Sequence, residues 1–153
     1  MNPALAGGLA CSLYLVSAAI QFFGQTPRSS LRRAMVMLTA LIAVVLHGLF
    51  SYQEIYTPAG INIGIYPMAS LTSLAIAVIV LASSLRRPVD NLLILLFPFA
   101  TLTVLLALFK EGSYTPRTDL NDGIVAHILL SVTAYSLLTV AAFQAALLSF
   151  GDY

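Results

Sequence analysis

The chain is short of charged and reactive side chains. Only 8% of its 153 residues are charged, tryptophan is absent, and Cys11 is the only cysteine. Cys11 therefore cannot form an intramolecular disulfide. The sequence also lacks the GxSxG, HExxH, P-loop and Rossmann glycine motifs. Because these motifs carry most soluble types of catalysis, we expect the chain not to be an enzyme.

The few charges exclude other classes of function. The formal net charge is +1, and no run of basic residues interleaved with aromatic residues suggests a nucleic-acid partner. Asp and Glu are absent from the interiors of the apolar stretches. A carboxylate proton relay or a cation path of the usual kind is therefore not indicated.

What the chain does have is apolar surface. Hydrophobic residues make up 59% of it, and the mean hydropathy is +0.95. A hydrocarbon core about 30 Å thick takes about 20 helical residues to cross. The charged residues divide the sequence into five continuous apolar stretches of about that length, so we expect an all-α, polytopic transmembrane helix bundle. The expected helices are 4–23, 34–52, 61–85, 91–109 and 123–150.

The distribution of basic residues predicts the orientation of the bundle. Five of the seven lie in the turns on one side, namely Arg28, Arg32, Arg33, Arg86 and Arg87. The positive-inside tendency makes that side cytoplasmic, which puts the N-terminus outside and the C-terminus inside. The first stretch has its positive charges after it and lacks a convincing cleavage site, so it is predicted to be a retained helix rather than a signal peptide.

The opposite side is predicted to carry two short loops, 53–60 and 110–122, that are rich in Pro, Gly, Tyr and Asn. Lys110 and Arg117 fall on this outer side. Pro98 lies inside the fourth stretch, where the missing backbone donor predicts a kink or a local opening of the helix. Pro67 is expected to have the same effect near the outer end of the third.

Two histidines interrupt the apolar stretches. His47 and His127 are the only histidines, and each is expected about 6 to 8 Å below the outer surface. Ionisable side chains at membrane depth are costly and usually face a bundle interior or a ligand. Two imidazoles at matched depth are what axial ligation of a haem iron would require. Matched depth permits such a site but does not establish it.

The fifth stretch adds a pattern of polar residues. His127, Ser131 and Tyr135 recur at i, i+4 and i+8, which places them on one stripe of a helix. A hydroxyl one turn away from an imidazole can fix its tautomer, as metal-binding histidines usually need. The spacing therefore makes Ser131 a candidate to orient the imidazole of His127.

Simpler explanations of the same residues remain open. An intramembrane histidine can merely hydrogen-bond a neighbouring helix, as serine, threonine and histidine do in many bundles. Lys110 and Arg117 can be snorkelling or topology residues rather than partners of a ligand's carboxylates. Outer tyrosines such as Tyr52, Tyr56 and Tyr66 are typical of an interfacial aromatic belt.

The segment Ile124-Val-Ala-His127-Ile-Leu-Leu-Ser131-Val-Thr-Ala-Tyr135-Ser resembles a helix of the cytochrome c assembly family, the CcsA-type haem-handling membrane proteins. His47 in an early helix, the Asn62-Ile-Gly-Ile-Tyr66-Pro-Met-Ala-Ser70-Leu71 stretch and the closing Leu-Leu-Ser-Phe-Gly-Asp152-Tyr153 agree with it, and the likeness is to the YpjD-like branch. Family members generally have more helices. The chain is thus expected to be one transmembrane domain, residues 1–153, from the N-terminal part of a longer protein of the bacterial inner membrane.

The resemblance implies haem handling or delivery during cytochrome c maturation, with other maturation proteins or an apocytochrome as partners. It implies non-covalent, b-type haem, since the chain lacks the CxxCH motif of covalent attachment. His127 is then an axial ligand and His47 a second one, unless further helices supply it. Ser131 and Tyr135 would orient His127, and Arg117 or Lys110 would meet the propionates. The alternatives are a transport or accessory subunit for a small solute and a haem-containing, quinone-linked electron-transfer subunit.

Overall fold

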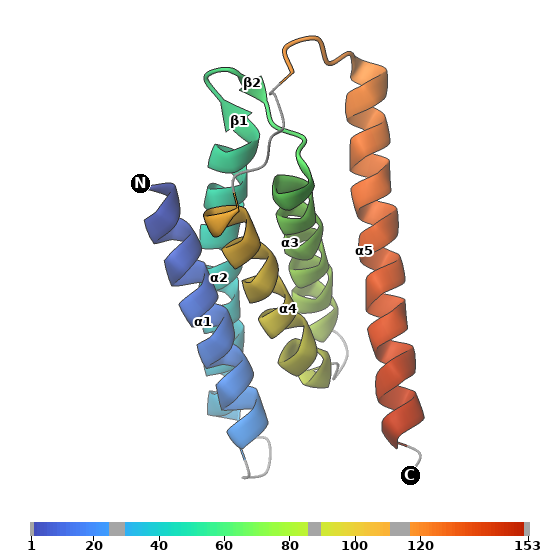
Figure 1. Cartoon of the computed structure of the whole chain (residues 1–153). Coiled ribbons are helices and arrows are strands. Elements are labelled where there is room, and N and C mark those ends of the chain that lie inside the picture. The colour runs from blue at the N-terminus through green and yellow to red at the C-terminus, as the bar shows by residue number, and fades with distance from the viewer. Residues whose placement is uncertain (1, 25–29, 86–89, 111–116, 152–153) are drawn as a thin grey trace.

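Five long helices make up nearly all of the structure, a computed structural model that describes residues 2–24, 30–85, 90–110 and 117–151 (Figure 1). Each is long and apolar enough to cross a membrane, so the prediction of an all-α, five-span transmembrane bundle is confirmed. In chain order the elements are α1 (Pro3–Phe23), α2 (Ser30–Ile55), β1 (Tyr56–Thr57), β2 (Gly60–Ile61), α3 (Ile65–Ser84), α4 (Asp90–Phe109) and α5 (Asp122–Gly151).

The helix ends differ from the expected spans at α2 and α3. The second helix is longer at both ends, and the third begins at Ile65 rather than at residue 61. Pro67 consequently lies in the first turn of α3, where proline is tolerated because its missing donor has no partner there. The expectation of a kink at Pro67 is therefore wrong. The fourth helix runs through Pro98 as one element.

The predicted loop after α2 is a small antiparallel hairpin. Tyr56 pairs with Ile61 and Thr57 with Gly60. Gly60 has a φ of +128°, and a Cβ on it would lie 2.7 Å from the carbonyl oxygen of Arg117, so only glycine fits. Ile61 also exchanges two backbone hydrogen bonds with Arg117. This bridge joins the two outer loops.

We call this side of the bundle the hairpin end and the opposite side the arginine end. At the arginine end, Arg33 Nη2 donates to the carbonyl oxygen of Ser84 at 2.6 Å, and Arg32 Nη1 donates to that of Gly24. Carbonyls at helix C-termini lack intrahelical partners, so these two arginines cap the C-terminal ends of α3 and α1. Arg28, Arg86 and Arg87 lie outside the described residues. The orientation, with the arginine end cytoplasmic, stays a prediction.

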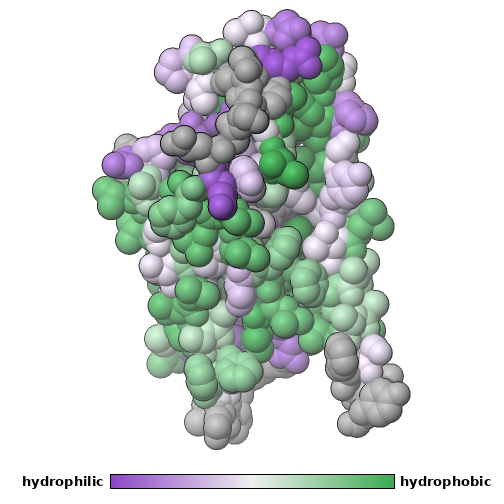
Figure 2. Space-filling model, in the orientation of Figure 1, coloured by the Kyte–Doolittle hydropathy of each residue, from purple (hydrophilic) through white to green (hydrophobic). Residues whose placement is uncertain are grey.

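Four helices form the core of the bundle. The first helix packs against α2 and α4, and α3 packs against α2 and α4 from the other side. Apolar side chains cover most of the visible face of the helices, whereas hydrophilic residues gather at the hairpin end (Figure 2). Small polar side chains link the helices inside the core. Ser17 Oγ donates to the Val36 carbonyl at 3.1 Å, and Ser73 Oγ lies 2.6 Å from Thr103 Oγ1.

The last helix, α5, stands apart from this core. Its contacts are mainly with α3 (Figure 1). Only 11% of the residues in its membrane span are buried, against 33–50% in the other four. Ser136 Oγ donates to the Thr72 carbonyl of α3 at 3.2 Å and marks the face of α5 that is covered. Most of the surface of α5 is therefore exposed.

The contact of α1 with the core depends on a glycine. A Cβ on Gly7 would lie 3.0 Å from Leu108 Cδ1 and 3.2 Å from Phe50 Cδ2, whereas one on Gly8 would meet nothing within 4 Å. We expect Gly7→Leu to lower the free energy of unfolding by about 1–3 kcal/mol, because it overpacks the interface. Thermal unfolding of the purified protein measures this, with Gly8→Leu as the matched control. Equal stability of the two variants would contradict the packing.

Candidate functional site

The first histidine, His47, lies at the centre of the core. Its side chain is fully buried, as are those of Tyr14 and Ser70. The hydroxyl of Tyr14 on α1 lies 3.2 Å from His47 Nδ1, and Ser70 Oγ on α3 lies 3.0 Å from His47 Nε2. The Tyr14 ring stands edge-on to the imidazole, with centroids 5.8 Å apart. Both ring nitrogens of His47 therefore have a partner, on two different helices.

The hydrogen bonds continue by one more side chain. Ser51 lies one turn after His47 on α2, and its Oγ is 3.4 Å from Ser70 Oγ. We call the four residues Tyr14, His47, Ser70 and Ser51 the His47 chain. A neutral imidazole offers one donor and one acceptor, so two hydroxyl partners satisfy it. The arrangement is that of a buried structural histidine linking α1, α2 and α3.

The second histidine, His127, has a very different environment. It lies five residues into α5 and is exposed on the surface of the bundle. Ser136 follows it by nine residues, which is two and a half helical turns, so the face of α5 that packs on α3 is opposite to His127. Among the described residues, His127 has no hydrogen bond or ion pair. Its imidazole is free to bind a ligand from outside.

The stripe predicted on α5 is partly confirmed in its geometry. Tyr135 is 64% exposed, and Ser131 is half-buried on the same side of the helix. The described residues nevertheless show no hydrogen bond from Ser131 or Tyr135 to the His127 ring. The side-chain hydroxyls thus do not orient the imidazole in this structure, and a role for them stays a prediction.

The structure does not bring the two histidines together. His47 lies eight residues before the end of α2, or about 12 Å along the axis, and His127 about 7 Å below the start of α5. Figure 1 shows α5 beginning near the height of the hairpin, above the end of α2. The expected matched depth is therefore wrong. Since His47 is also sealed in the core, a site shared by the two is not supported.

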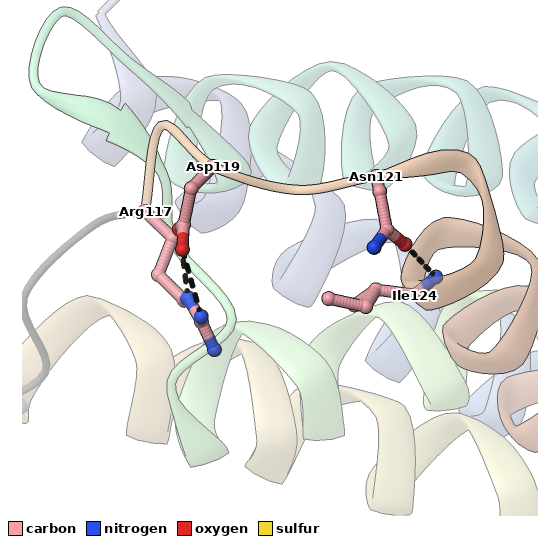
Figure 3. A network of polar contacts seen from close by, with 4 residues as sticks. All are labelled: Arg117, Asp119, Asn121 and Ile124. Atoms are coloured by element: carbon pink, nitrogen blue, oxygen red, sulfur yellow. Dashed lines mark hydrogen bonds and ion pairs between the residues drawn. The ribbon is translucent and has the colours of Figure 1, made fainter.

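The segment before α5 is held by its own polar contacts (Figure 3). Arg117 Nε and Nη2 donate to the two carboxylate oxygens of Asp119 at 3.1 and 3.0 Å. These bonds hold the pKa of the Asp119 carboxyl below its usual value. Asn121 Oδ1 accepts from the Ile124 N–H at 2.9 Å and caps the start of α5. Arg117 is thus already engaged in an exposed ion pair, and Lys110 is exposed.

A cavity of about 270 Å³ lies at the hairpin end between α2, α3 and α5. Its walls are mainly apolar, with Leu71 and Leu74 from α3 and Ile128 from α5. Ser51 and Tyr52 from α2 also line it. It therefore lies next to the His47 chain, whereas His127 itself is not among its lining residues.

Sequence reasoning missed Tyr14, Ser70 and Ser51 as partners of His47. One signal was present, because His47 and Ser51 have the same i, i+4 spacing as His127 and Ser131. The other two partners lie on different helices, and hydrogen bonds between helices leave no pattern of spacing in the sequence. The same hydroxyl spacing thus occurs beside a buried histidine and beside an exposed one.

Five membrane-spanning helices with a hydrogen-bonded polar core define the chain as a multi-pass integral membrane protein. Comparison with known proteins places it in the inner membrane. It is 30% identical over 147 residues to the inner membrane protein YpjD of Escherichia coli K12, and equally to YpjD of the O6:H1 strain CFT073 and of O157:H7.

The matched region covers 95% of this chain and 56% of each relative's length. The chain therefore spans little more than half the length of the curated relatives that it matches. No protein-family model and no solved structure matches it. The similarity supports a membrane protein related to YpjD.

The two histidines should differ in their effect on stability. We expect His47→Ala to lower the free energy of unfolding by about 1–3 kcal/mol, because Tyr14 and Ser70 lose their buried partner. His127→Ala should change it by less than about 0.5 kcal/mol, since the side chain is exposed. Thermal unfolding of both variants in one detergent gives the comparison. A similar loss in both would contradict the assignment of His47 as the structural histidine.

Proposed function

We propose that this protein binds haem at the exposed face of α5, with His127 as an axial ligand, and takes part in haem handling for cytochrome c maturation. The observation that carries the proposal is the state of His127. It is an exposed imidazole near the hairpin end of a membrane helix, with no hydrogen bond or ion pair among the described residues. Imidazole nitrogen is a common axial ligand of haem iron.

The residues around His127 fit a single-ligand site. Exposed apolar side chains lie on the same side of α5 as the histidine, among them Leu130 and Leu138. A macrocycle with an apolar face would cover such a surface, and the iron when bound would supply the redox or transfer chemistry. Ser131 and Tyr135 lie along the same side of α5 and would contact the group or the bound imidazole.

Arg117 is the proposed partner for a propionate. Its guanidinium is half-exposed and pairs with Asp119, which is more exposed still. Exposed ion pairs contribute little free energy, so exchange of one carboxylate for another costs little. Lys110, exposed at the end of α4, is the second candidate cation at this end.

The proposal assigns no ligand role to His47. Both of its nitrogens are engaged, and freeing one would leave Tyr14 or Ser70 without a partner in the core. The second axial position is then filled by a group from outside this chain's described residues, such as a delivery partner, an apocytochrome or further helices. No covalent step by this chain is part of the proposal.

Two other functions are compatible with the sequence. Passage of a small solute calls for a hydrated path, whereas the cavity described here is apolar and lies at the hairpin end. Quinone-linked electron transfer calls for a redox-active haem held permanently, whereas an exposed single ligand is better suited to release. The exposed His127 therefore favours haem handling over both.

Absorption spectra of the purified protein titrated with haem test the proposal. We expect a shift of the Soret band in the unmodified protein that is lost in His127→Ala and restored by added imidazole. His47→Gln is the matched control, because its amide retains a donor and an acceptor for the core. It should keep the shift.

A shift that survives in His127→Ala, or one that disappears only in His47→Gln, would contradict the assignment. Haem binding that needs both histidines equally would favour a shared site, which this structure does not form. Arg117→Gln should weaken haem binding without removing the Soret shift, since the arginine acts on the propionates and not on the iron.

A further inference from the structure

The cavity at the hairpin end is a candidate binding site that does not depend on the haem proposal. It holds about 270 Å³ between α2, α3 and α5. Native interiors are close-packed and leave few voids larger than a water molecule. A space of this size approaches the smaller ligand pockets of proteins, so its shape and chemistry need a physical account.

Gly48 of α2 lines the cavity beside α3. A Cβ on Gly48 would lie 3.9 Å from Leu74 Cδ2, an ordinary van der Waals contact, so a larger side chain at this position would extend into the cavity. The hydrogen bond that ties α5 to α3 comes from Ser136, about two turns beyond Ile128 on the lining. The hydrogen bond from Ser136 thus ties α5 to α3 on the arginine-end side of the cavity, whereas at Ile128 the cavity lies between the helices.

One polar residue of the wall, Ser51, has a hydroxyl with spare hydrogen-bonding capacity. Ser51 is 2% exposed and lines the cavity, yet among the described residues its hydroxyl has only the contact to Ser70 Oγ at 3.4 Å. That distance is at the long limit for a hydroxyl pair, and a hydroxyl can donate once and accept twice. Buried hydroxyls are usually well hydrogen-bonded, so the single long contact of Ser51 indicates that its hydroxyl can bind a further partner in the cavity.

The remaining walls define the rest of the ligand. Leu71, Leu74 and Ile128 are apolar and would contact a hydrocarbon body. Behind Ser51, the hydroxyl of Ser70 and the imidazole of His47 can relay donor or acceptor character, because neighbouring hydrogen bonds polarise one another. The wall therefore accepts either a hydroxyl or a carbonyl at the same place.

We propose that this cavity binds a lipid-soluble molecule that has an apolar body and one hydroxyl or carbonyl oxygen. The oxygen hydrogen-bonds Ser51 and so extends the His47 chain by one member. The apolar body lies against Leu71, Leu74 and Ile128. Such a molecule reaches the site from the bilayer, in which the surrounding helices are embedded.

Photolabelling of the full chain in lipid nanodiscs tests the proposal. The probe is octanol carrying a photoreactive diazirine, and the matched probe is octane with the same diazirine. We expect octanol to label the cavity-lining segments of α2 and α3 about fivefold more than octane does, since one hydrogen bond separates the two probes. Peptide mass spectrometry locates the label.

Two sets of variants test separately the hydrogen bond to Ser51 and the volume of the cavity. Ser51→Ala should reduce octanol labelling to the level of octane, and Ser51→Thr, which keeps the hydroxyl, should retain the preference. Gly48→Leu should abolish cavity labelling by both probes because it fills the space, whereas Gly8→Leu, at a glycine with nothing within 4 Å, should leave it unchanged.

Label spread evenly over the exposed leucines of the helices, with no preference for the cavity, would overturn the proposal. Equal labelling by octanol and octane would also overturn it, because the site would then recognise hydrocarbon alone. Since neither probe contains a haem group or binds His127, failure here and failure of the haem proposal are distinguishable.

Discussion

The hydrogen bonds of His47 are the interaction on which the arrangement of the bundle depends. Hydrocarbon offers no partner to a polar side chain, so an imidazole in a membrane helix must find its donors and acceptors inside the protein. Tyr14 and Ser70 supply them from α1 and α3. This requirement fixes the rotation of three helices about their axes, and the apolar residues around the imidazole then fill the core.

The same need for hydrogen-bond partners acts on the polar side chains of α5, but there most of these side chains stay outside the core. Its one buried hydroxyl, Ser136, bonds to α3, and the stripe that carries His127 and Tyr135 faces away from the bundle. An exposed polar stripe in a membrane helix calls for a partner, whether a bound group or another helix.

Composition and charge spacing predicted the five helices, because the thickness of a bilayer and the cost of burying charge act on the sequence directly. The helix ends were less accurate. The hairpin depends on the bridge between Ile61 and Arg117, which are far apart in the chain, and no local pattern contains it. Likewise, the depth of His47 depended on α2 extending to Ile55, past the polar residues Gln53 and Glu54 that had suggested a loop.

The candidate site could be predicted only in part for a related reason. Spacing along one helix showed that His127, Ser131 and Tyr135 share a side, but not whether that side is covered. The central claim is that one histidine is structural and the other available. Nitrogen NMR of the protein labelled at its two histidines, before and after ferric haem is added, tests it most directly. We predict that the His127 ring signals broaden or vanish and that those of His47 persist; loss of the His47 signals with those of His127 unchanged would contradict the account.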